Sequence, residues 1–175
     1  DKSSKISETI PFRNEGDNLF KCLASLQQQK FDRSSYEVIL VNDHSTDISV
    51  QIVESFIAKT DINIRLTALT NTETKKAALK HGINLASHTI IATTDADSVL
   101  PVNWLQNISL HFNGNNGMLL GPVMFSEKAG FLAAFQTLDM LALQGVEFGA
   151  LGFNKPILNN AANLSYSVAS YKNVN

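Results

Sequence analysis

The chain has 175 residues, enough to bury one sizeable core and too few for two ordinary domains, so we predict a single globular unit. Its composition, with 44% hydrophobic and 17% charged residues, excludes an intrinsically disordered chain. A formal net charge of -2 provides no basic field for a polyanion, so we predict no nucleic-acid partner.

Short apolar runs alternate along the chain with segments of helical period, which is the pattern of strands that cross over through helices into a largely parallel sheet. The run Val-Ile-Leu-Val at residues 38–41 is typical of a strand buried on both faces. Strands are expected near residues 6–12, 38–41, 64–69, 89–94 and 118–125. Helices are expected over about residues 18–26, 48–57, 74–86, 101–112 and 131–146.

The first two predicted helices are preceded by polar residues that can accept a hydrogen bond from a free backbone amide. Asp17 or Asn18 is expected to cap the first helix, and Ser45 or Thr46 the second. The apolar stripe of the first helix includes Cys22, the one cysteine, which cannot form an internal disulfide. Its predicted setting is therefore a core position in a protein of a reducing compartment.

The predicted helix over residues 131–146 is apolar around its circumference. Core packing is the leading interpretation of this pattern. The alternative is that the helix contacts a membrane surface or a segment outside the chain. No stretch of the sequence approaches the roughly 20 consecutive apolar residues that a transmembrane helix needs.

Polar residues follow three of the predicted strands directly, at residues 13–15, 42–43 and 95–97. In an open α/β sheet, ligands bind at the carboxyl ends of the strands, so these residues should open onto one edge of the sheet. Each group taken singly also fits a helix cap or a solvated loop. The sequence lacks the Gly-rich phosphate loops of dinucleotide dehydrogenases and P-loop NTPases, which argues against both classes.

The strongest of these signals is Asp95-Ala96-Asp97. Residues two apart in an extended segment project to the same side, so both carboxylates can converge on one divalent cation such as Mg²⁺ or Mn²⁺. A cap or an exposed surface is the competing interpretation. Lys75 and Lys76, near the start of the third helix, suit a diphosphate group and equally suit a solvated surface.

Four segments together, at residues 10–15, 41–47, 75–79 and 94–98, resemble the motifs of glycosyltransferase family 2 in order and in spacing. The resemblance extends over about residues 6–112 and is looser beyond. It implies a GT-A fold, a Rossmann-like α/β/α sandwich with a largely parallel central sheet. The chain would then be one part of a longer protein.

The resemblance also implies an activity and a domain organisation. Family members are inverting enzymes that move a sugar from a nucleotide-diphosphosugar, here expected to be a UDP-sugar, to an acceptor hydroxyl. The expected setting is the synthesis of polysaccharide, glycolipid or cell envelope. Residues 1–175 would form a single GT-A domain that is incomplete on its C-terminal acceptor side. Residues 1–112 would be the nucleotide-sugar-binding half, and residues 113–175 part of the acceptor-side half.

Carried over by position, the family motifs assign four residues to the nucleoside. Pro11 and Arg13 would line the pocket for the nucleobase and ribose, with Glu15 beside it. Asp43 would accept a hydrogen bond from the base.

The same comparison assigns three residues to the diphosphate and its cation. Lys75 matches the residue near the diphosphate, and Asp95 would face the ribose and the outer shell of the metal. Asp97 would be the direct ligand of the cofactor, Mn²⁺ or Mg²⁺.

The chain departs from the family pattern in two places. Strand one carries Ser7, Glu8 and Thr9 where the family is usually continuously apolar, which predicts a frayed or altered edge. The general base of the family follows a segment that resembles residues 159–166, so it is expected beyond residue 175. Glu147 is an acid in the later part of the chain, and we do not assign it that role.

The implied partners are a nucleotide-diphosphosugar donor and a carbohydrate or lipid-linked acceptor. The expected localisation is cytoplasmic, at the cytoplasmic face of the inner membrane in a full-length protein, with any membrane association supplied by segments outside this chain. Two alternatives stay open: a sugar-nucleotide-binding module that is catalytically incomplete, and a sugar-nucleotide nucleotidyltransferase. Residues 12–16 do not reproduce the Gly-rich loop that usually opens the latter.

Overall fold

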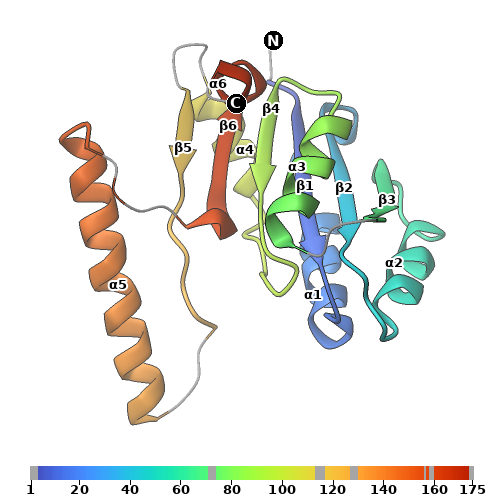
Figure 1. The fold of residues 1–175 in the computed structure, drawn as a ribbon, viewed down its shortest axis with the longest axis horizontal. Helices are drawn as coiled ribbons and strands as arrows, with labels where there is room; N and C mark the ends of the chain where they lie inside the picture. The colour runs from blue at the N-terminus through green and yellow to red at the C-terminus, as the bar shows by residue number, and fades with distance from the viewer. Residues whose placement is uncertain are drawn as a thin grey trace.

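The computed structural model of the protein describes residues 4–70, 74–112, 117–126, 130–155, 157 and 160–173. One six-stranded sheet runs through these ranges in the order β3-β2-β1-β4-β6-β5 (Figure 1). The strands are β1 (Ile6–Phe12), β2 (Tyr36–Asn42), β3 (Ile64–Ala68), β4 (Ile90–Thr93), β5 (Met118–Leu120) and β6 (Leu164–Ser167). Strands β1 to β4 pair in parallel, and β6 lies antiparallel between β4 and β5, so the predicted α/β class with a largely parallel sheet is confirmed.

Helices cover both faces of the parallel part of the sheet. The helices of the described ranges are α1 (Gly16–Gln27), α2 (Ser49–Ile57), α3 (Lys75–Leu85), α4 (Trp104–His111), α5 (Phe131–Gly152) and α6 (Val168–Asn173), with short 3-10 turns η1 (Arg33–Ser35) and η2 (Ala161–Asn163). Apolar side chains of α1, α2 and α4 join the larger core cluster on one face. Ala78 of α3 packs against Ile39 and Val41 of β2 on the other face.

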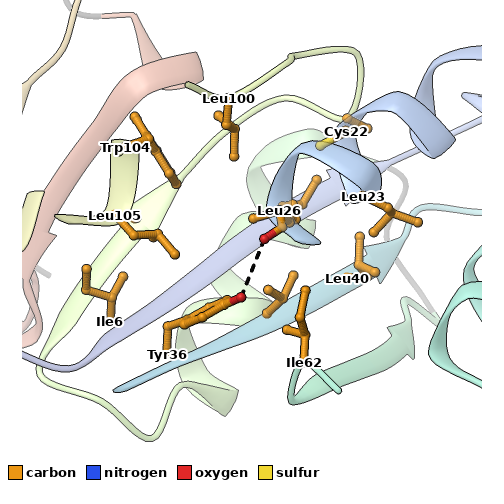
Figure 2. Packing of buried hydrophobic residues seen from close by; sticks show 14 of the residues in the cluster. Ile6, Cys22, Leu23, Leu26, Tyr36, Leu40, Ile62, Leu100, Trp104 and Leu105 are labelled. Carbon is orange, nitrogen blue, oxygen red and sulfur yellow. Dashed lines mark hydrogen bonds between the residues drawn. The ribbon is translucent and has the colours of Figure 1, made fainter. Parts of the chain in front are cut away.

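The larger core confirms the apolar stripe predicted for the first helix. Figure 2 shows Cys22, Leu23 and Leu26 of α1 over the sheet, together with Trp104 and Leu105 of α4. All five side chains are buried, and Cys22 is a free thiol in the described chain. The sheet contributes Ile6, Ile10, Val38 and Leu40 to the same cluster. Burial of this stripe holds α1 against the sheet, and the loop that joins α1 to β1 borders the candidate site.

Strand β1 is not a frayed edge, so that expectation is wrong. It pairs with β2 along its whole length and with β4 over its first four residues, which places it in the interior of the sheet. Over those four residues the backbone is paired on both sides despite the polar sequence. Ser7 donates to Glu37 Oε1 at 2.6 Å, whereas Glu8 and Thr9 are buried without side-chain partners among the described residues.

Neither of the two capping predictions holds, because α1 already begins at Gly16 and α2 begins only at Ser49. The third helix begins close to its predicted start, where Thr74 caps α3 by accepting a hydrogen bond from the Ala77 amide at 3.1 Å. Asp47 Oδ1 accepts from the Ser49 amide at 3.0 Å in front of α2.

Helix α5 stands apart from the sheet, at the left of Figure 1. Its buried residues are polar, Gln144 and Glu147, so the interpretation as a core helix is wrong in the described structure. The Gln144 amide group bonds both backbone groups of Val123, at 2.9 and 2.7 Å, and Glu147 Oε1 accepts from the Asn160 amide at 3.0 Å. Large apolar side chains are exposed along α5: Phe131, Leu132, Phe135, Leu138, Leu141, Leu143, Val146, Phe148 and Leu151.

Two smaller differences lie near α5 and α4. Strand β5 ends at Leu120 rather than near residue 125, since Val123 pairs with the Gln144 side chain instead of with a strand. Pro101 precedes α4 rather than opening it, and its carbonyl accepts from the Trp104 amide at 2.9 Å. Within the described ranges, no helix combines the length and the apolar character needed for a membrane span.

Candidate functional site

A cavity of about 280 Å³ opens at the carboxyl edge of the sheet. It lies where β1, β2 and β4 end and where α3 begins, the position at which open α/β sheets bind ligands. Its lining residues are Pro11, Phe12, Arg13, Glu15, Asp43, Lys75, Asp95, Ala96 and Asp97. The structure therefore brings together all the residues that the sequence singled out for the donor and its cation. Phe12 and Ala96 also line the cavity, although the sequence did not single them out as site residues. Each lies in the chain between two predicted site residues.

The end of β1 forms one wall. Pro11 and Phe12 are the last residues of the strand, and Phe12 is buried in the large core cluster. The Asp43 amide donates to the Phe12 carbonyl at 2.9 Å, which continues the pairing of β1 with β2 one residue past the end of β2. Arg13 and Glu15 follow in the loop that leads to α1, so the buried strand end fixes where their side chains start.

Asp43 directly follows β2 and is buried at the cavity. Its Oδ1 lies 3.2 Å from Nδ1 of His44, which has a left-handed backbone with a φ of 59°. A left-handed non-glycine residue turns the chain sharply. The loop therefore leaves the sheet edge immediately after Asp43.

Asp95-Ala96-Asp97 reaches the cavity by a different geometry from the one predicted. Strand β4 ends at Thr93, and the acids lie in a turn that is closed by a 3.1 Å hydrogen bond from the Ser98 amide to the Asp95 carbonyl. The two acids therefore do not converge as alternate residues of an extended strand. Ala96 is buried in the core cluster and anchors the middle of the turn, while both carboxylates line the cavity.

Lys75 lies at the start of α3 and crosses to the acid turn. Its Nζ is 2.5 Å from Asp95 Oδ1, and both side chains keep part of their surface exposed. Lys76 is exposed and is not among the lining residues. It therefore agrees with the interpretation of this lysine as a solvated surface residue. Among the acids of the cavity, Asp95 is thus the one paired with a lysine.

The donor set of this cavity fits a hard divalent cation only in part. In the described residues, no group of three or more His, Cys, Asp or Glu side chains is arranged to hold a metal ion. Asp95 and Asp97 offer carboxylate oxygens on one wall. Mg²⁺ commonly takes one or two carboxylates and fills its remaining positions with phosphate oxygens and water. Two acids on the wall of an open cavity are consistent with that arrangement.

The later part of the chain is joined to the first by the pairing of β6 with β4 and by polar side-chain contacts. Thr93 Oγ1 donates to the Ala161 carbonyl at 2.8 Å, and Trp104 Nε1 donates to Asn163 Oδ1 at 2.9 Å. Glu147 does not line the cavity, because its carboxylate is buried against the Asn160 amide. This contact agrees with leaving Glu147 unassigned as a base.

Comparisons with known sequences agree with the motifs. A family model described as Glycosyl transferase family 2 matches residues 8–162. Glycosyltransferase AglE of Haloferax volcanii is 31% identical over 130 residues, which are 74% of this chain and 42% of AglE. Glycosyltransferase GlyG of Streptococcus pneumoniae is 29% identical over 106 residues, 61% of this chain and 34% of GlyG. The chain thus spans less than half the length of these relatives.

Comparisons with solved structures agree with the fold. S. aureus TarS 1-349 has a TM-score of 0.64 at 25% identity, covering 73% of this chain and 38% of that one. The mannosyltransferase PcManGT from Pyrobaculum calidifontis, solved with GDP-Man and Mn²⁺, has a TM-score of 0.76 at 18% identity, covering 98% of this chain and 46% of that one. The second likeness concerns the fold alone. With the family match, the ordered motifs and the shared fold together, the chain belongs to glycosyl transferase family 2.

Proposed function

We propose that this chain binds a nucleotide-diphosphosugar in the cavity at the sheet edge and transfers its sugar, with inversion, to an acceptor hydroxyl. One observation carries the proposal: residues from four separate segments, after β1, after β2, at the start of α3 and after β4, line a single cavity. These are the four segments that carry the family motifs. Residues 1–112 are the nucleotide-sugar-binding half in this proposal, and residues 113–175 belong to the acceptor side.

The nucleoside is assigned to the walls formed by β1 and β2. Asp43 is buried at the cavity and can accept a hydrogen bond from an N–H group of the base. Pro11 and Arg13 flank the base and ribose, and Glu15 stands beside them. A carboxylate acceptor held by a buried strand end favours a base that presents a ring N–H.

The diphosphate is assigned to the opposite wall. Lys75 provides a positive charge next to the acid turn, and Asp95 and Asp97 provide the oxygens for a Mn²⁺ or Mg²⁺ ion. A bound divalent cation would stabilise the negative charge that grows on the departing nucleoside diphosphate. Lys75 Nζ lies 2.5 Å from Asp95 Oδ1 on this wall.

Transfer is proposed as a single displacement at the anomeric carbon. The acceptor oxygen forms its bond to that carbon as the bond to the diphosphate oxygen breaks, so the configuration inverts. The proton of the acceptor hydroxyl passes to a general base, to which we assign no described residue. General-base assistance is typically worth about 10²–10⁴-fold in rate, so a chain without it would bind the donor and transfer sugar slowly.

UDP is the nucleotide to test first. S. aureus TarS 1-349 has been solved with UDP-GlcNAc, and its likeness to this chain reaches 25% identity. The GDP-Man complex belongs to a protein that is 18% identical. The donor sugar is left to experiment.

The acceptor is proposed to be a carbohydrate or a lipid-linked group of the cell envelope. Relatives include poly(ribitol-phosphate) beta-glucosyltransferase of Bacillus spizizenii, 31% identical over 96 residues. Another is poly-beta-1,6-N-acetyl-D-glucosamine synthase of Staphylococcus aureus, 24% identical over 149 residues. A cytoplasmic site at the inner membrane is proposed with it, and the buried free thiol of Cys22 suits a reducing compartment.

Calorimetric titration with UDP, with and without Mn²⁺, tests the proposal. Binding is expected to need the cation, and Asp97→Ala should weaken it at least about tenfold. Asp139→Ala is the matched control, because Asp139 is an exposed aspartate of α5 that does not line the cavity. If UDP, GDP and dTDP all fail to bind with metal present, the donor-site proposal is wrong. UDP release from a UDP-sugar with acceptor present then separates a transferase from a binding module.

A further inference from the structure

The loops after β1 and β2 share an unusual backbone feature beside the cavity. Asn14 and His44 both have left-handed backbones, with φ values of 55° and 59°. Each directly follows a residue that lines the cavity, Arg13 in the first loop and Asp43 in the second. Asn14 itself does not line the cavity, although Arg13 and Glu15 on either side of it do. Its side chain is therefore available for contacts outside the cavity.

Asn14 bonds the second loop with both its side chain and its backbone. The Thr46 amide donates to Asn14 Oδ1 at 2.8 Å, and Thr46 Oγ1 lies 3.4 Å from the same oxygen. The Asn14 amide donates to Ser45 Oγ at 3.1 Å. These bonds join residues that are 31 and 32 positions apart in the sequence.

The next two amides continue the same junction. The Glu15 amide donates to Ser49 Oγ at 2.9 Å, and the Gly16 amide donates to Asp47 Oδ2 at 3.1 Å. Amides at a helix start lack intrahelical partners, and α1 has no side-chain cap of its own. The second loop therefore supplies the partners that the start of α1 needs. We call residues 14–16 and 45–49, joined in this way, the loop clasp.

We propose that Asn14 is a positioning residue of the donor site: through the loop clasp it fixes Asp43 relative to Arg13 and Glu15. The inference rests on the proposed function for the meaning of the cavity. Two properties are required at this position, a tolerated left-handed backbone and a side-chain oxygen that accepts the Thr46 amide. Asparagine and aspartate offer both, whereas glycine offers only the first.

The test uses two substitutions at the position and one elsewhere. Asn14→Gly keeps the left-handed backbone accessible and removes the acceptor, and Asn14→Asp keeps an acceptor oxygen. Asn154→Gly is the matched control, since Asn154 has a φ of 56° just beyond α5 and does not line the cavity. The full 175-residue chain is used throughout. A buffer with added salt screens the charge that aspartate adds beside Asp47.

Two readouts are measured, one without ligand and one with UDP and Mn²⁺. In Asn14→Gly, hydrogen exchange of the Thr46 amide should quicken about tenfold, because the bond that protects this amide is lost. The Kd for UDP should rise by about threefold to tenfold, which corresponds to the loss of one hydrogen bond. Asn14→Asp should restore both values toward those of the unsubstituted protein. Asn154→Gly should change neither.

Each outcome decides a different point. Unchanged Thr46 exchange in Asn14→Gly would overturn the clasp itself. Faster exchange with an unchanged Kd would overturn the positioning role while the proposed function stands. Failure of the unsubstituted chain to bind any nucleoside diphosphate would overturn the proposed function, and the positioning role with it.

Discussion

Helices α1 and α5 are both rich in apolar residues, yet α1 buries most of its apolar side chains and α5 exposes most of its own. The 12 residues of α1 bury Leu19, Cys22, Leu23 and Leu26 against the sheet. The 22 residues of α5 bury only Gln144 and Glu147 and expose most of their large apolar side chains. The apolar residues of α1 form one stripe, whereas those of α5 surround the helix. Apolar content alone therefore does not decide burial; a single face that matches a neighbouring sheet does.

The part of the chain that carries the candidate site and the part that carries α5 also differ in how they are held in place. All the lining residues of the candidate site fall between positions 11 and 97, on or next to elements that pack in the two buried core clusters. The connection to α5 is made instead by polar bonds of Gln144 and Glu147. A cavity needs walls whose positions are fixed, and the first part provides them through packing.

The largest effect is expected for truncation of the α1 stripe. Leu23→Ala removes a buried side chain from the core cluster and should lower the free energy of unfolding by about 2–5 kcal/mol. Urea denaturation at neutral pH measures it. An effect within about 0.5 kcal/mol would mean that α1 is not packed as described.

The next effect concerns Glu8, a buried acid in β1 whose carboxylate oxygens have no partner in the described residues. Burial raises the pKa of Glu8 from 4.5 to about 8, so the folded state keeps it protonated. Stability should therefore fall as pH rises from about 4.5 to about 8, by up to about 5 kcal/mol. Unfolding curves across this range should show that Glu8→Gln removes the loss. An unchanged pH slope would contradict this account.

Glu37 in β2 is the matched control for that prediction. Burial raises its pKa, but hydrogen bonds from Ser7 and Ser87 outweigh burial and leave the pKa below its ordinary value. Its contribution to stability is then present above the unfolded pKa and is lost as the pH falls through the lowered folded value. Glu37→Gln should therefore alter the acid limb of the profile, on the opposite side from Glu8→Gln.

A smaller effect is expected where α5 is tied to the rest of the protein. Gln144→Leu removes both bonds to Val123 and leaves the two backbone groups unpaired, at a cost of about 1–3 kcal/mol. Hydrogen exchange of the Val123 amide should quicken more than that of amides in β1 and β2. Equal changes in both places would show that α5 unfolds together with the sheet.

The smallest effect is expected on the exposed surface of α5. Leu138 is 66% exposed, so Leu138→Ala should change the free energy of unfolding by no more than about 0.5 kcal/mol. The same urea experiment as for Leu23→Ala measures it, with the same side chain removed from a helix. A loss as large as that of Leu23→Ala would mean that something covers Leu138 in solution.

The sequence predicted those features whose cause is local. The apolar run of β2 and the apolar stripe of α1 each predict that these side chains are buried, and both predictions are confirmed. The start of the third helix was also predicted, close to Lys75 where α3 begins. The gathering of Asp43, Lys75 and Asp97 at one edge followed from the order of parallel strands together with the family resemblance.

The features that escaped prediction depend on residues distant in sequence. Strand β6 lies antiparallel between β4 and β5, and no local pattern in residues 164–167 predicts this arrangement. Ser45 and Thr46 looked like helix caps, but they bond Asn14 across the loop clasp. The exposure of α5 depends on what lies beside it, which periodicity does not reveal.

The most direct test of the central claim is an amide NMR titration of the chain with UDP and Mg²⁺, because it reports on both parts of the molecule at once. The account predicts the largest shift changes in residues 11–16, 43–47, 75–77 and 95–98, with α5 unchanged. Changes that centre on α5, or none at saturating UDP, would contradict a donor site at the carboxyl edge of the sheet.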